Sequence, residues 1–152
     1  IERKAAELKA NIGNIPIAID CSATPRPLSL ARFLLMHGFH VYAVFLDEIC
    51  AVEKDDFYFL QKYRPMLSLR STMHYKRRLL CRDDIKKYGT VLAIGQKAAY
   101  FTGTNHFVNL IENSGLYGYT GLLKILDMMA VAVREEKNVP AIIQTKAWGC
   151  QA

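Results

Sequence analysis

Cys21, His106 and Asn109 are the side chains in this sequence best suited to facing a ligand or cofactor. Each follows or lies within an apolar, strand-like run, and open α/β sheets bind their ligands at the carboxyl ends of the strands. Gln96 and Lys97 are further polar residues that fold considerations alone place near such a cavity. The competing interpretation is that Cys21 is a small buried hydrophobe and that His106 has ordinary core or surface partners.

A glycine-rich turn runs from Gly115 through Tyr117 and Gly118 to Gly121. Unpaired N–H groups at the start of the following helix can favour an anion there. The glycine spacing matches neither of the common nucleotide-binding loops, so it does not by itself indicate phosphate binding. We expect the turn to shape the wall of an interdomain cofactor cavity in a larger protein; the alternative is a tight turn that needs glycine at positive φ.

The cysteines do not form a metal-binding or disulfide pattern. The four of them are widely separated, with no C-x-x-C and no Cys/His pair at zinc spacing: Cys21, Cys50, Cys81 and Cys150. We therefore expect no complete metal site and no bound cofactor within this chain by itself. Secreted disulfide-rich domains contain far more cysteine, so a cytoplasmic location is expected.

The chain has a net charge of +6, and its basic residues cluster around Lys76-Arg77-Arg78. A solvated basic face is the favoured interpretation of this cluster, and docking of nucleic acid or an acidic partner is the alternative. No nucleic-acid motif accompanies the cluster, so nucleic acid is not the expected partner. No apolar run is long enough to span a membrane.

Hydrophobic patterning predicts alternating strands and helices. The expected strands cover residues 15–19, 40–46, 66–69, 90–94 and 106–111, and the expected helices cover 2–12, 29–37, 55–63, 96–101 and 122–136. Runs of buried type joined by helices predict an α/β, Rossmann-like, open and mostly parallel sheet with helices on both faces, in three layers. We expect one domain over 1–137 and a tail or linker over 138–152. Because Ile1 replaces an initiating Met and no signal peptide follows, we expect a piece of a longer chain.

Two stretches resemble the nitrogenase component-1 family. Residues 15–41 resemble the opening strand, helix and strand of a nitrogenase-type domain. The strand ending at Gly95, its helix, the segment Leu116-Tyr117-Gly118-Tyr119-Thr120-Gly121 and the long amphipathic helix after it resemble the C-terminal domain of nitrogenase component 1 and of its relatives in cofactor assembly and chlorophyll synthesis. The resemblance covers roughly residues 10 to 137.

The resemblance implies an oxidoreductase of three Rossmann-like domains that packs with a homologous subunit. Such proteins hold iron–sulfur clusters between domains and receive electrons from a separate ATP-dependent reductase. The family's molybdenum enzyme has a cofactor-binding histidine a few residues before the turn, and Asn109 stands at that position here, with His106 nearby. This departure favours a divergent member without nitrogen-fixing chemistry.

Two functions from different classes follow from these observations. The first is a domain of a nitrogenase component-1-like oxidoreductase that helps to form an iron–sulfur or related metal-cofactor site between domains and is inactive alone. Its cofactor-binding residues would be Cys21, His106, Asn109, Gly115, Tyr117, Gly118 and Gly121. The second is a small-molecule or nucleotide binding module that uses the carboxyl edge of the sheet.

Overall fold

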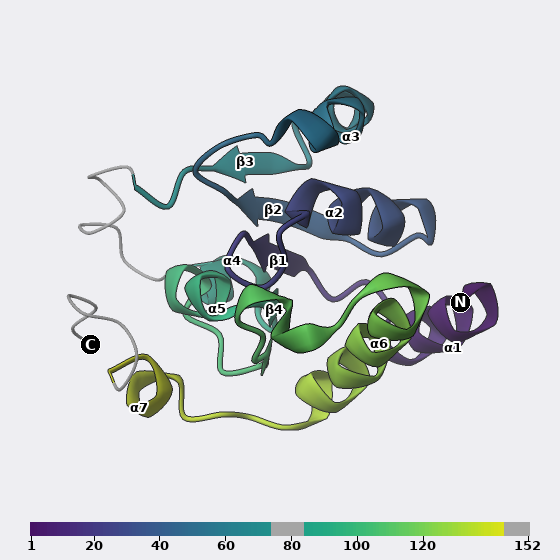
Figure 1. Cartoon of the computed structure of the whole chain (residues 1–152). Coiled ribbons are helices and arrows are strands. Elements are labelled where there is room, and N and C mark those ends of the chain that lie inside the picture. The colour runs from purple at the N-terminus through teal and green to yellow at the C-terminus, as the bar shows by residue number, and fades with distance from the viewer. Residues whose placement is uncertain (74–83, 145–152) are drawn as a thin grey trace.

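The computed structural model describes residues 1–73 and 84–144 (Figure 1). Within this part of the chain, the strands form one five-stranded sheet in the order β3-β2-β1-β4-β5, with every pairing parallel. The strands are β1 (Ile17–Asp20), β2 (Val41–Phe45), β3 (Ser68–Arg70), β4 (Leu92–Ile94) and β5 (Phe107–Val108). The basic cluster at Lys76-Arg77-Arg78 lies outside the described residues.

Helices cover both faces of the sheet. One face carries α1 (Glu2–Ile12), α2 (Pro27–Met36) and α6 (Gly118–Arg134), and the other carries α4 (Asp84–Tyr88), α5 (Gln96–Thr102) and α7 (Val139–Gln144). The helix α3 (Lys54–Leu60) packs beside α2, between the short helical turns η1 (Ala51–Glu53) and η2 (Gln61–Tyr63); a third such turn, η4 (Glu112–Gly115), precedes α6. This arrangement confirms the predicted Rossmann-like α/β fold with three layers.

The central strand β1 is buried and pairs in parallel with a strand on each side. Ile17, Ala18 and Ile19 are fully buried, so β1 needs apolar cover on both faces. The backbone of Ile17 is in register with Val41 of β2 on one side and with Leu92 of β4 on the other. The chain visits β2 and β3 on one side of β1 before it crosses to β4, so the order of the strands reverses between β1 and β4. This switch point is where ligands bind in open α/β sheets.

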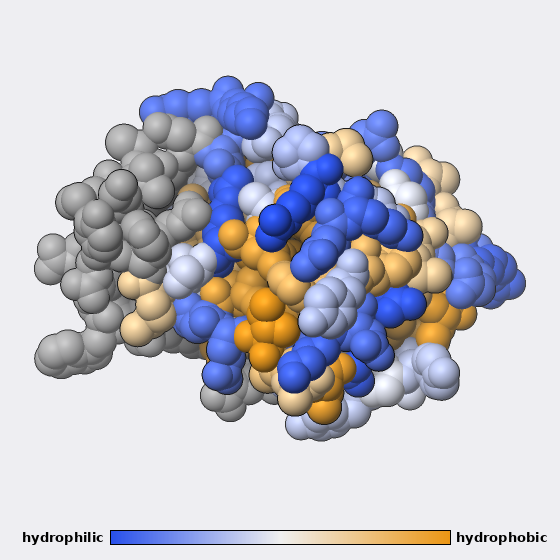
Figure 2. Space-filling model, turned by 90° about the horizontal axis from the view of Figure 1, so that it is seen from above, coloured by the Kyte–Doolittle hydropathy of each residue, from blue (hydrophilic) through white to orange (hydrophobic). Residues whose placement is uncertain are grey.

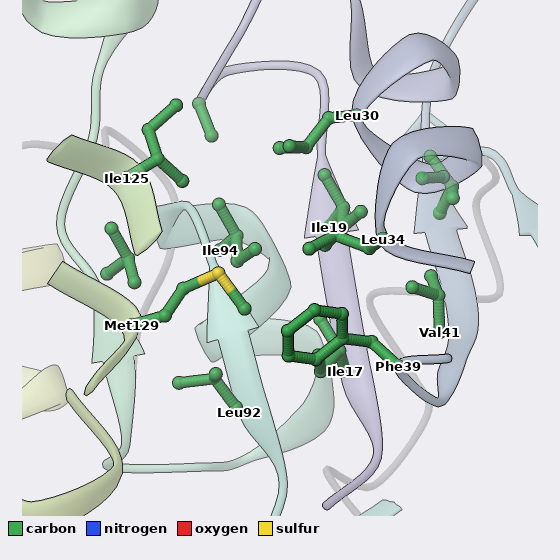
Figure 3. Packing of buried hydrophobic residues seen from close by; sticks show 14 of the residues in the cluster. Ile17, Ile19, Leu30, Leu34, Phe39, Val41, Leu92, Ile94, Ile125 and Met129 are labelled. Atoms are coloured by element: carbon green, nitrogen blue, oxygen red, sulfur yellow. The ribbon is translucent and has the colours of Figure 1, made fainter. Parts of the chain in front are cut away.

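The larger core lies between the sheet and the layer formed by α1, α2 and α6 (Figure 3). Met129 and Ile125 of α6 pack toward Leu92 and Ile94 of β4, and Ile125 lies farther toward the carboxyl ends of the strands than Met129. The helix α6 therefore runs antiparallel to the strands. Its first residues lie on the carboxyl side of the sheet and its last residues lie on the amino side.

Three elements differ from the sequence-based expectation. The strand β5 is shorter than the predicted 106–111 run, because the chain leaves the sheet after Val108. The helix α6 begins at Gly118, so the end of the glycine-rich turn forms its first helical turn. The segment predicted as a tail contains the helix α7. Its first residue, Val139, is only 5% exposed and packs with α5 on the second face of the sheet.

The side of the molecule that carries α3 and the edge strand β3 exposes apolar residues. Ile49 and Val52, between β2 and α3, are 39% and 68% exposed, and Met66 is 68% exposed. Figure 2 looks onto this side and shows hydrophobic surface near its centre, bordered by hydrophilic side chains. Exposed apolar side chains of this kind can contact another domain or subunit. In the described residues, no helix is long and apolar enough to cross a membrane.

The packing of α6 predicts a large difference between two of its positions. Met129 is fully buried and Val131 is 48% exposed. Met129→Ala should lower the free energy of unfolding by about 2–5 kcal/mol, because it leaves a cavity against β4. Val131→Ala should change it by less than about 0.5 kcal/mol. Urea unfolding of both variants measures the difference, and equal losses would contradict the described packing.

Candidate functional site

Polar groups follow the strand ends at the carboxyl edge of the sheet. Cys21 follows β1, Asp47 lies two residues after β2, Thr72 lies two residues after β3, Gln96 lies two residues after β4, and Asn109 follows β5. The edge is continuous, because the backbone N–H of Cys21 donates to the carbonyl of Phe45 at the end of β2. Two of the sequence-predicted residues, Cys21 and Asn109, therefore lie on one edge.

The carboxyl group of Asp20 accepts hydrogen bonds from both sides of the switch point. In the described part of the chain, Asp20 is completely buried and accepts hydrogen bonds from the N–H groups of Ser22 (2.7 Å), Ala23 (3.1 Å) and Ala98 (2.7 Å), and from the Ser22 hydroxyl. Ser22 and Ala23 belong to the loop after β1, and Ala98 belongs to α5, which follows β4. Burial raises the pKa of the Asp20 carboxyl, and these hydrogen bonds oppose the shift.

Gly95 is required beside this carboxyl group. Its φ of +107° is unfavourable for other residues, and a Cβ atom at this position would lie 2.2 Å from Oδ2 of Asp20. The carboxyl group of Asp20 occupies the space that a side chain at position 95 would need. The strand–glycine–helix pattern in the sequence is thus explained by contact with Asp20.

The thiol of Cys21 lies in a partly buried, charged environment. Its Sγ atom lies 4.0 Å from Oδ2 of Asp47, and the same oxygen lies 3.8 Å from Nζ of Lys97. Burial raises the pKa of the Cys21 thiol; the positive charge of Lys97 opposes this, and the carboxylates of Asp47 and Asp20 add to it. Asp47 is itself fixed by the N–H of Thr72 at 3.0 Å and by the Thr72 hydroxyl. Among the described residues, Cys21 is the thiol at this edge.

Asn109 and Gln96 form a side-chain pair at the ends of the neighbouring strands β5 and β4. Nε2 of Gln96 donates to Oδ1 of Asn109 at 2.8 Å, and both side chains are half-buried. This bond leaves the Asn109 amide nitrogen and the Gln96 carbonyl as the groups able to bind elsewhere. The pair therefore adds neutral hydrogen-bonding groups to the edge beside Cys21 and Lys97.

The glycine-rich turn lies on the carboxyl side of the sheet, where α6 begins. Gly115 and Gly118 have φ values of +76° and +58°, and a Cβ atom on Gly121 would lie 2.5 Å from the backbone carbonyl carbon of Leu116. The backbone geometry alone therefore accounts for these glycines. Tyr117 is 72% exposed, so its ring is available to a neighbouring molecule or domain.

His106 does not lie at the carboxyl edge, and this part of the sequence-based expectation is wrong. It precedes β5, and its Nδ1 atom donates to the carbonyl of Ala132 near the end of α6 at 3.0 Å. Its Nε2 atom lies 3.7 Å from the Glu136 carboxylate. The predicted strand 106–111 put His106 and Asn109 near the same end. In the structure β5 covers only Phe107 and Val108, so His106 lies at its amino end and Asn109 at its carboxyl end.

Glu53 is a buried group whose role the sequence analysis missed. It is 1% exposed, and its Oε1 atom accepts the N–H groups of Leu28 (2.8 Å) and Ser29 (3.0 Å) in the first turn of α2. It therefore caps a helix that lies 24 or 25 residues away in sequence. Burial raises the pKa of the Glu53 carboxyl, and the two N–H donors oppose the shift. No local motif indicates a cap supplied from so far away.

The edge does not hold a full set of metal ligands. Across residues 1–73 and 84–144, no three His, Cys, Asp or Glu side chains converge on a position suited to a metal ion. Cys50 is exposed, and Cys81 and Cys150 lie outside the described residues. Cys21 is the thiol at the edge among the described residues, so this part of the chain could supply at most one sulfur ligand there.

No protein-family model matches this chain, and no curated protein matches it.

Adding a methyl group at Gly95 tests the contact with Asp20. Gly95→Ala should lower the free energy of unfolding by about 3 kcal/mol or more, because it combines an unfavourable φ with a clash against a buried carboxylate. Gly89→Ala is the matched control, since Gly89 also has positive φ (+72°) but open space around its Cβ position. The control should lose about 1 kcal/mol in the same denaturant titration. Similar losses in both variants would contradict the close approach of Gly95 to Asp20.

The environment of Cys21 predicts slow reaction with alkylating reagents. The thiolate is the reactive form, so a raised pKa leaves less of it at any given pH. In the folded protein at about pH 8, Cys21 should react with iodoacetamide more slowly than the exposed Cys50. As the pH is raised, the labelling rate of Cys21 should still increase at a pH where the rate for an unperturbed thiol has become constant. Mass spectrometry of the labelled peptides measures both rates, and faster labelling of Cys21 would contradict this environment.

Proposed function

We propose that this chain is a Rossmann-like domain of a nitrogenase component-1-like oxidoreductase. In this proposal, its carboxyl edge forms one wall of a site for an iron–sulfur or related metal cofactor in a longer protein. The observation that supports it most directly is that Cys21, directly after β1, and the Gly115-to-Gly121 turn, at the start of α6, both lie on the carboxyl side of the sheet although they are far apart in the sequence. This side carries the half-buried thiol of Cys21, which supports a role for it in a cofactor site.

The proposed contribution of this chain to the metal site is a single sulfur ligand. Iron–sulfur clusters are commonly held by up to four cysteine thiolates, and a bound cluster supplies electron-transfer chemistry. Cys21 must lose its proton to bind metal; burial and the carboxylate of Asp47 oppose this loss, and the positive charge of Lys97 favours it. The remaining ligands would come from other parts of the longer protein, so the domain alone would be inactive.

Asn109 stands where the nitrogenase family's molybdenum enzyme has a cofactor-binding histidine. This difference supports a divergent member of the family rather than a nitrogen-fixing enzyme. Asn109 offers an amide, already paired with Gln96, where an imidazole ligand would be expected. His106 lies toward the amino end of β5 and is bonded to Ala132, so it does not replace the missing ligand. The cofactor would accordingly differ from one held by a histidine from this domain.

The proposal includes a homologous subunit or self-association through the longer protein, and an ATP-dependent reductase as electron donor. Exposed Ile49 and Val52 near the edge strand β3, and exposed Tyr117 and Tyr119 at the start of α6, offer apolar and aromatic surface for such contacts. A longer protein that packs against these surfaces would exclude water from the carboxyl edge.

Iron and sulfide analysis after anaerobic reconstitution tests the proposed function. The full-length protein should retain stoichiometric iron and sulfide, Cys21→Ser should lose most of both, and the matched variant Cys50→Ser should keep them. The chain studied alone should hold much less than one cluster per molecule, because it lacks a full set of thiolates. Absence of a stoichiometric cluster from the full-length protein and from this chain would contradict the proposal.

A further inference from the structure

Parallel α/β sheets usually bind phosphate groups at one place, beside the switch point of the sheet. The loop after a strand and the first turn of the next helix present backbone N–H groups that no helical carbonyl can accept, and an anionic ligand accepts them. In this protein that place lies beside the ends of β1 and β4, where the loop after β1 leads into α2.

Carboxyl groups of the protein itself accept these N–H groups. Glu53 accepts those of Leu28 and Ser29 in the first turn of α2. Asp20 accepts those of Ser22 and Ala23 in the loop after β1. Glu53 is 1% exposed and Asp20 is completely buried, so water does not compete for these bonds. These four donors, in the loop after β1 and in the first turn of α2, are therefore already used.

The nearby cationic side chains are also paired with carboxylates. Nζ of Lys97 lies 3.8 Å from Asp47. Asp56 lies 3.9 Å from Arg26 and 3.0 Å from Arg32. A phosphate entering this edge would meet negative groups and occupied donors, and it would have to displace a buried carboxylate from its bonds. Like charges in a partly buried environment disfavour such an exchange.

We propose that Asp20 and Glu53 determine the specificity of the carboxyl edge by occupying the positions of a ligand's phosphate groups. The edge therefore discriminates against nucleotides and other phosphorylated ligands and accepts neutral or cationic ones. This inference does not depend on the proposed metal cofactor, since it concerns which ligands the edge rejects. It favours the oxidoreductase interpretation over a nucleotide-binding module.

NMR titration of the ¹⁵N-labelled chain with inorganic phosphate tests this inference, with chloride at equal ionic strength as the reference. In the wild-type protein, the amides of Ser22, Ala23, Leu28 and Ser29 should show no saturable shift with phosphate. Saturable binding at these amides in the wild-type protein would overturn the proposal, and this result does not require any variant to fold.

Removing one carboxyl group should create phosphate binding. In Glu53→Ala, phosphate should shift the amides of Leu28 and Ser29 saturably and raise the Tm by at least about 2 °C more than chloride does. Glu48→Ala removes an exposed carboxylate from the same segment and should behave like the wild-type protein. A folded Glu53→Ala variant that ignores phosphate would overturn the proposal, as would an equal response of Glu48→Ala.

Discussion

The buried carboxyl group of Asp20 is the interaction on which the carboxyl edge of this sheet depends. It lies at the end of the central strand and accepts hydrogen bonds from the loop after β1 and from α5 after β4. Without it, N–H groups on both sides of the switch point would be buried without acceptors, each at a cost of roughly 1–3 kcal/mol. The requirement for Gly95 follows from the same carboxyl group, because its oxygens fill the space beside that residue.

Two consequences for ligand binding follow from this carboxyl group and from Glu53. The loop that carries Cys21 is fixed, so the thiol lies beside Asp47 and Lys97. Four backbone donors near it are occupied by Asp20 and Glu53, so these donors are not available to an anion.

Much of the fold could be predicted from the sequence, because buried parallel strands form continuous apolar runs. The runs at Ile17–Asp20 and Val41–Phe45, and the helix between them, have a pattern that depends on nearby residues only. The position of α7 could not be predicted in this way, since Val139 is buried by contacts with a helix about 40 residues earlier in the sequence. Local periodicity does not contain that information.

The candidate site was predicted only in part, for the same physical reason. Residues that directly follow strands, such as Cys21 and Asn109, reach the carboxyl edge whatever the details of the loops. His106 was misplaced because a difference of a few residues in the length of β5 moves it to the other end of the strand. The roles of Asp20 and Glu53 depend on partners 78 and 25 residues away, and no spacing rule connects them.

Amide hydrogen exchange of Ala98 tests the central role of Asp20 most directly. In the wild-type protein, the Ala98 amide should exchange as slowly as the amides of β1, because it donates to a fully buried carboxyl group. In Asp20→Ala, the amides of Ala98, Ser22 and Ala23 should lose protection together while β1 and β2 stay protected. If Ala98 remained protected in that variant, or exchanged rapidly in the wild-type protein, Asp20 would not be the group that joins the two sides of the switch point.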